Sequence, residues 1–215
     1  MKLGNTLLLG DSYSTFEGYI PDGYDSWFSK ETQGRTDVSK VEQTWWYQVF
    51  DGKENVLLKN ESFSGTTICN TVRPELTVDT SFISRFDKLV CSGFFEKNTL
   101  DTILIFGSTN DCWINVPFGE IKYEDFTNED LLSFCPACCY LASRINETVP
   151  NAKVFWLINT DLNEEFPKSI KKIANHYNQN CLEFKKIDKM SGHPSVAGMK
   201  QIAEDFTNKR RIGFI

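Results

Sequence analysis

Residues 6–14 read TLLLGDSYS, an apolar run that ends abruptly in a polar turn. Its three consecutive leucines are apolar on both faces of an extended chain, which is typical of a strand buried inside a parallel sheet. Gly10 and Asp11 are residues that favour turns, so the strand is expected to end there. Ser12 therefore stands at the carboxyl end of a strand, where open α/β sheets bind their ligands.

The same alternation of short apolar runs and longer amphipathic stretches continues along the chain. We expect strands at residues 6–9, 56–58, 102–106, 153–158 and 183–187, and helices near residues 41–50, 81–91, 129–148, 164–180 and 195–208. This pattern predicts an α/β fold, a three-layer α/β/α sandwich around a parallel sheet of about five strands. No repeat or linker divides the 215 residues, so we expect a single domain over residues 1–215.

The composition argues against several classes of protein. Hydrophobic residues make up 40% and charged residues 24%, which is typical of a globular chain and not of a disordered one. The net charge is −6 and the 23 Lys and Arg residues are scattered, which disfavours nucleic acid and membrane surfaces as partners. The N-terminus has no long apolar run of the kind found in signal peptides, so we expect a cytoplasmic location.

Polar residues follow the first three expected strands and precede the last expected helix. They read GDSYS (10–14), NESFSG (60–65), GSTND (107–111) and GHP (192–194). A hydroxyl nucleophile, a base and hydrogen-bond donors for an oxyanion are the groups that acyl transfer needs. The carboxyl ends of parallel strands share one edge of the sheet, so we expect these residues in one crevice.

In this order, the four segments resemble the SGNH/GDSL hydrolase family over nearly the whole chain. The resemblance implies a flavodoxin-like fold, with Ser12 as the nucleophile and His193 as the base. It also implies an oxyanion hole formed by Ser12, Gly65 and Asn110, and it calls for no metal or other cofactor. Residues 10–21 and 41–46 resemble a branch of intestinal-type bacterial members of this family.

The sequence departs from the family pattern at two positions. Ser108 stands where the third segment usually has glycine, and Met190 stands where the acidic member of the triad is usual, three residues before the histidine. Asp188 can reach the imidazole Nδ1 of His193 if residues 189–192 loop out, and we favour it as the third member of the triad. Otherwise a backbone carbonyl orients the ring, which leaves a Ser–His dyad.

Aromatic side chains flank the motifs. Tyr13 and Trp113 follow the first and third segments, and we expect both to contact the substrate, although Trp113 is equally well explained as a core residue. Neighbouring side chains on a helix diverge by about 100°. Only one of Trp45 and Trp46 is therefore expected to face the sheet, while the other is exposed or covers a loop.

The cysteines favour a structural role over a metal or redox role. Seven cysteines are an odd number without a regular framework, so we expect reduced thiols. Cys135, Cys138 and Cys139 include a Cys-x-x-Cys spacing, but no second pair accompanies it at the spacing of a zinc site. We therefore expect buried thiols within a helix.

Together these observations predict a serine ester hydrolase for small, acetyl-like acyl groups. Its partner would be a small ester, with acylated carbohydrates favoured, because the insertion at residues 17–40 is polar and makes a poor lipid-binding lid. One alternative is a lipase or thioesterase for longer acyl chains. Another is a non-catalytic ligand-binding member of the fold, which would explain why Met190 and Ser108 depart from the family pattern.

Overall fold

A five-stranded parallel sheet forms the centre of the structure, a computed structural model that describes residues 2–50 and 52–212. The strand order is β2-β1-β3-β4-β5, and every neighbouring pair is parallel. The strands are β1 (Gly4–Gly10), β2 (Asn55–Ser62), β3 (Thr102–Gly107), β4 (Lys153–Ile158) and β5 (Asn180–Glu183). A separate antiparallel hairpin joins β6 (Lys189–Met190) to β7 (His193–Pro194).

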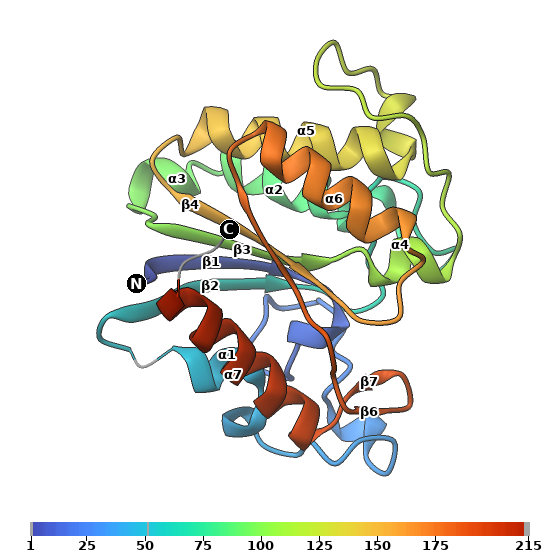
Figure 1. Cartoon of the computed structure of the whole chain (residues 1–215). Helices are drawn as coiled ribbons and strands as arrows, with labels where there is room; N and C mark the ends of the chain where they lie inside the picture. Colours follow the sequence, from blue (N-terminus) through green and yellow to red (C-terminus); the bar gives the residue numbers. More distant parts are fainter. Residues whose placement is uncertain (1, 51, 213–215) are drawn as a thin grey trace.

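Helices cover both faces of the sheet, which confirms the expected three layers (Figure 1). One face carries α2 (Phe82–Cys91), α5 (Phe134–Thr148) and α6 (Glu165–His176), and the other carries α1 (Trp45–Val49) and α7 (Val196–Ile212). Two short helices, α3 (Phe94–Lys97) and α4 (Thr109–Trp113), lie at the two ends of β3. Short 3₁₀ turns occur at Ser12–Ser14, Lys30–Thr32, Val41–Gln43, Val78–Thr80 and Asp130–Leu132. In the described part of the chain, no helix has both the length and the apolar composition needed to cross a bilayer.

The leucines of β1 show why the central strands are apolar on both sides. Leu7 and Leu9 pack into the core beneath α2, α5 and α6, whereas Leu8 packs into the core beneath α1 and α7. All three are fully buried, because successive side chains of a strand point to opposite faces and both faces are covered.

Several expected elements have different bounds, and the last strand and the first helix differ for clear physical reasons. The last strand pairs with β4 over residues 180–183, not 183–187, because the chain leaves the sheet after Glu183 and takes Phe184 and Ile187 into the core under α7. The expected helix at residues 41–50 divides into a 3₁₀ turn and α1, which begins after the capping residue Thr44. Both tryptophans of α1 are buried in the core under this face of the sheet. Trp45 contacts Phe106 of β3, and Trp46 contacts the exposed loop residue Tyr19.

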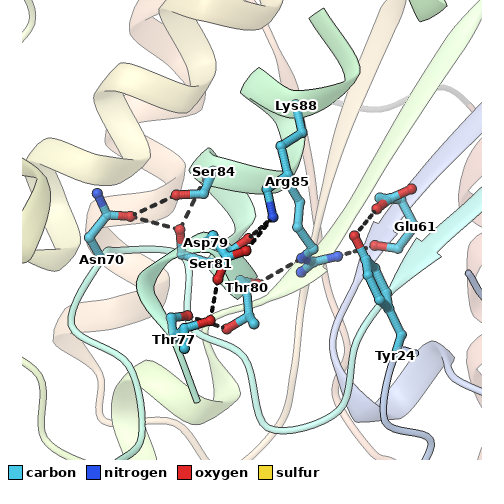
Figure 2. Close-up of polar contacts among 10 residues, drawn as sticks. All are labelled: Tyr24, Glu61, Asn70, Thr77, Asp79, Thr80, Ser81, Ser84, Arg85 and Lys88. Atoms are coloured by element: carbon cyan, nitrogen blue, oxygen red, sulfur yellow. Dashed lines mark hydrogen bonds and ion pairs between the residues drawn. The ribbon is translucent and has the colours of Figure 1, made fainter. Parts of the chain in front are cut away.

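A buried arginine, Arg85, joins the strand ends that carry the site, and Figure 2 shows its contacts with Glu61 and Thr80. Arg85 of α2 donates to the carbonyl oxygens of Gly10, at 3.1 Å, and Glu61, and so joins the ends of β1 and β2. It also donates to Thr66 Oγ1 at 3.1 Å and Thr80 O at 2.8 Å. Burial lowers the pKa of Arg85 to about 10, which still leaves the guanidinium charged at neutral pH.

Candidate active site

Ser12 is presented by a sharp turn at the end of β1. Asp11 caps the 3₁₀ turn, because its carboxylate accepts a hydrogen bond from the backbone N–H of Tyr13 at 3.0 Å. A Cβ at Gly10 would lie 2.4 Å from Ser62 Oγ, so only glycine allows β1 and β2 to approach this closely here. Burial raises the pKa of Asp11 to about 7, and the capping bond gives this residue a structural role.

The structure brings Ser12 and His193 together from opposite ends of the chain. His193 Nε2 lies 2.9 Å from Ser12 Oγ, and Nδ1 lies 3.1 Å from the carbonyl oxygen of Ser191. A carbonyl oxygen only accepts hydrogen bonds, so this contact assigns the proton to Nδ1. Nε2 is then the unprotonated nitrogen, and it faces the serine hydroxyl.

The structure pairs the Asp188 carboxylate with Ser195, whereas a contact with His193 was expected. The Asp188 carboxylate accepts a hydrogen bond from Ser195 Oγ, and Asp188 forms no ion pair or hydrogen bond with the imidazole in the described part of the chain. The physical reason is the path of the backbone. Asp188 O accepts from Ser195 N at 3.0 Å, which closes the β6–β7 hairpin and keeps Asp188 beside the start of α7.

Aromatic rings pack against the imidazole of His193, which was expected to be oriented by a carboxylate. Trp27 stacks on the imidazole with centroids 3.6 Å apart and planes 10° apart. Trp113 meets the same ring edge-on at 5.8 Å, lines the cleft and is 44% exposed. Tyr13 is fully buried and does not line the cleft. Its hydroxyl donates to Gly192 O at 2.7 Å, so it supports the loop that carries His193.

The residues expected to form the oxyanion hole with Ser12 are Gly65 and Asn110, and both line the same cleft as Ser12 and His193. Gly65 has φ +80°, a left-handed conformation that favours glycine. The backbone N–H groups of Ser12 and Gly65 have no acceptor in the described part of the chain. Asn110 Nδ2 donates to Thr66 O at 3.0 Å, and Asn110 Oδ1 accepts from Arg73 at 3.1 Å. These two neighbours fix the amide orientation and leave the second Nδ2 proton for another acceptor.

The third segment reaches this geometry without the glycine of the family pattern. Ser108 has φ +73° and is buried, so it adopts the left-handed conformation with a side chain in place. Its hydroxyl donates to the carbonyl of Gly107, a local bond that offsets part of the strain. Asp111 ties this segment to the loop after β2, because its carboxylate accepts from the backbone N–H groups of Ile68 at 3.0 Å and Cys69 at 3.3 Å.

The surroundings of His193 favour its neutral form. Burial is the main cause that lowers its pKa to about 4. The Ser191 carbonyl opposes this shift, and the positive charges of Arg35, Lys189 and Arg73 each add a smaller lowering effect. The imidazole is therefore neutral at physiological pH and free to accept a proton at Nε2.

A cleft of about 380 Å³ opens over the serine and the histidine. Several lining residues were not among the expected site residues, and three of them contact Asn110 or the aromatic rings of the site: Trp27, Arg35 and Arg73. They belong to long connections without regular periodicity, so no strand-end signal pointed to them. The remaining lining residues are Ser12, Asp25, Ser64, Gly65, Glu75, Leu76, Asn110, Trp113, Ser191 and His193.

The cysteine cluster lies away from this cleft. Cys135, Cys138 and Cys139 are buried within α5, and their thiols are free. Burial raises the pKa of Cys139 to about 12, which keeps that thiol protonated. Among the residues described, no group of His, Cys, Asp and Glu side chains is arranged to hold a metal ion.

Comparison with known proteins gives a consistent result. The chain is similar to a protein from Bacteroides ovatus described as a GDSL-like lipase, with 44% identity, a TM-score of 0.89, and coverage of 99% of this chain and 100% of that one. A second protein of the same description, from Bacteroides uniformis, is 36% identical with a TM-score of 0.89 over 98% of this chain and 96% of its own. None of the curated proteins compared with the chain matches it.

More distant structures share the fold. A family two carbohydrate esterase from Clostridium thermocellum, solved in complex with cellohexaose, is 18% identical with a TM-score of 0.66 over 99% of this chain and 65% of its own. The family model described as GDSL-like lipase/acylhydrolase matches residues 5–209. The chain therefore belongs to the family of GDSL-like lipases and acylhydrolases.

Proposed function

We propose that this chain is a serine ester hydrolase that cleaves short acyl esters. The observation that carries the proposal is the 2.9 Å contact between His193 Nε2 and Ser12 Oγ at the floor of an open cleft. The family shares hydrolase chemistry, and a nucleophile within hydrogen-bond reach of a neutral base is the arrangement that such chemistry requires.

The proposed reaction uses only groups of this chain, an ester and water. His193 Nε2 takes the proton of Ser12 as Oγ attacks the ester carbonyl, and the carbonyl oxygen becomes an oxyanion. The imidazolium then gives this proton to the leaving alcohol as its bond to the acyl carbon breaks. Water, deprotonated by the same imidazole, attacks the acyl-serine, and the proton returns to Ser12 as the carboxylic acid leaves.

The developing oxyanion is proposed to accept from the N–H groups of Ser12 and Gly65 and from Asn110 Nδ2. Donors fixed before the reaction stabilise this charge without reorganising, and a single such donor contributes roughly 3–4 kcal/mol to the lowering of the barrier. The contact of Arg73 with Asn110 Oδ1 supports this role, because a cation on the oxygen side polarises the amide and makes its N–H a better donor.

His193 acts in this proposal without a carboxylate partner. The Ser191 carbonyl holds the Nδ1 tautomer, and the stacked Trp27 ring fixes the plane of the imidazole. Because the partner of Nδ1 is a carbonyl and the Asp188 carboxylate is bonded to Ser195, we propose a Ser–His dyad in place of the Asp188 triad.

The lining of the cleft favours small acyl groups. Its apolar surface comes from separate side chains, Trp27, Leu76 and Trp113, among polar and charged neighbours. Binding a long acyl chain needs a continuous apolar groove, since each buried methylene contributes about 0.8 kcal/mol. Acetyl-sized groups on a polar alcohol fit this lining, and carbohydrate esterases with the same fold make a sugar alcohol a reasonable choice.

The test is a series of p-nitrophenyl esters from acetate through butyrate to octanoate. We expect kcat/KM to fall as the acyl chain lengthens, with no activation at a lipid interface. A series that rises to octanoate would favour the lipase alternative. A complete absence of hydrolysis that depends on Ser12 would favour the non-catalytic alternative.

A further inference from the structure

Two arginine side chains contact different parts of the candidate site. On the oxyanion side, Arg73 donates to Asn110 Oδ1 at 3.1 Å, and a Cβ at Gly65 would lie 3.6 Å from Arg73 Cδ. On the histidine side, Arg35 Cζ lies 4.6 Å from the centre of the Trp27 ring, which itself stacks on His193. Both arginines line the cleft.

Neither arginine has an acidic partner among the described residues. Some other cations of the chain do form ion pairs: Arg144 with Asp87 and Glu147, and Lys189 with Asp161. Asp25 and Glu75 also line the cleft, but both are exposed and form no ion pair with either arginine. Two guanidinium groups thus face the cleft with most of their donors unused.

The charges that act most strongly on the imidazole are positive. The charged groups that act on His193 are Arg35, Lys189 and Arg73, and all three oppose its protonation. A neutral ester has no net charge for this field to attract when it binds, whereas an anionic ester is attracted to it.

We infer that the substrate is an ester whose alcohol part carries a carboxylate, held by Arg35 with Arg73. The inference rests on the proposed function and narrows its substrate class to acylated hydroxy acids or acidic sugars. We place the carboxylate on the alcohol part of the ester, because an acetyl-sized acyl group has no carboxylate of its own. Guanidinium suits this role, since its planar set of donors matches the two oxygens of a carboxylate.

The experiment compares two acetyl esters that differ in one charge, 4-acetoxybenzoate and 4-acetoxybenzamide. Each kcat/KM is divided by the rate of alkaline hydrolysis of the same ester, which removes the difference between the two leaving groups. For the unmodified protein, we expect a corrected preference of about tenfold for 4-acetoxybenzoate, which falls as salt is added.

Substitutions then assign the preference to the two arginines. Arg35→Gln should reduce it several-fold, and Arg35→Glu should turn it into a preference for the amide. Arg73→Gln should slow both esters, because Arg73 contacts Asn110, and should also reduce the preference. Lys186→Gln is the matched control, since it removes an exposed positive charge outside the cleft, and it should leave the preference unchanged.

The outcomes separate the inference from the function on which it rests. Hydrolysis of both esters at equal corrected rates, or a preference that Arg35→Glu leaves intact, would overturn the anionic substrate while the esterase stands. If neither these esters nor p-nitrophenyl acetate is hydrolysed, the esterase proposal fails, and the anionic substrate fails with it.

Discussion

Ser12 and its proposed oxyanion partners follow the ends of strands, whereas His193 lies on a hairpin outside the sheet. The strand-end side is fixed by buried polar contacts: Arg85 joins the ends of β1 and β2, and Asp111 joins the third segment to the loop after β2. The histidine side is fixed by ring contacts and by bonds to backbone carbonyls, through Trp27, Tyr13 and Ser191. The two sides should therefore respond differently to substitution.

The largest loss of activity is expected on substitution of Ser12 or His193, where the strand-end side and the histidine side meet. Ser12→Ala and His193→Ala should each lower kcat for p-nitrophenyl acetate by about 10³-fold or more, and the double variant should be scarcely slower, because nucleophile and base act as a unit. His176→Ala is the matched control, since this second histidine is exposed on α6 and stacks on Tyr123. Near-normal turnover by Ser12→Ala would rule out the mechanism.

On the strand-end side, Asn110→Ala should lower kcat by roughly 10²-fold with little change in KM, because an oxyanion donor acts mainly in the transition state. Steady-state kinetics separates the two parameters. A raised KM with normal kcat would instead make Asn110 a residue that only binds the substrate.

On the histidine side, Trp27→Ala should lower kcat/KM at pH 7 by about tenfold, because the imidazole loses the ring that orients it. It should also expose the imidazole, so the pKa of His193 should rise from about 4 toward its ordinary value. The reaction needs neutral His193, so activity is lost as the pH falls through this pKa. The acidic limb of the kcat/KM profile should therefore move to higher pH.

Trp27→Phe keeps an aromatic ring and should retain both the rate and the acidic limb. Trp113→Ala removes the ring that meets His193 edge-on and should change the acidic limb less. An unchanged limb in Trp27→Ala would show that the stacked ring does not control the protonation of His193.

The smallest effect is expected at Asp188. Asp188→Asn should change kcat/KM by less than about twofold, because the carboxylate accepts from Ser195 and not from His193. Thermal unfolding checks that the variant keeps its fold, since the replaced group lies at the start of α7. A loss of about 10³-fold with an intact fold would restore the triad.

The same division explains what could be predicted from the sequence. The layers and the strand-end segments follow from local patterns, because a buried strand is apolar on both faces and its end is marked by turn residues such as Gly10 and Asp11. The β6–β7 hairpin has no such pattern. Whether Asp188 or a carbonyl meets His193 depends on the backbone bond from Ser195 to Asp188, which composition and spacing do not reveal.

The aromatic residues show a second limit. Tyr13 follows Ser12 directly, yet its ring is buried in the core. Trp27 lies fifteen positions after Ser12 in an irregular loop, yet its ring stacks on His193. Loops carry function in positions set by tertiary contacts, so neither outcome follows from proximity along the chain.

The central claim is that His193 activates Ser12 without a carboxylate partner, and labelling with a fluorophosphonate tests it most directly. Intact mass and peptide mapping would follow the reaction in the unmodified protein, His193→Ala and Asp188→Asn. We predict one adduct, on Ser12, that forms at least about 100-fold more slowly in His193→Ala and at an unchanged rate in Asp188→Asn. No adduct, an adduct on another residue, or labelling that requires Asp188 would contradict the claim.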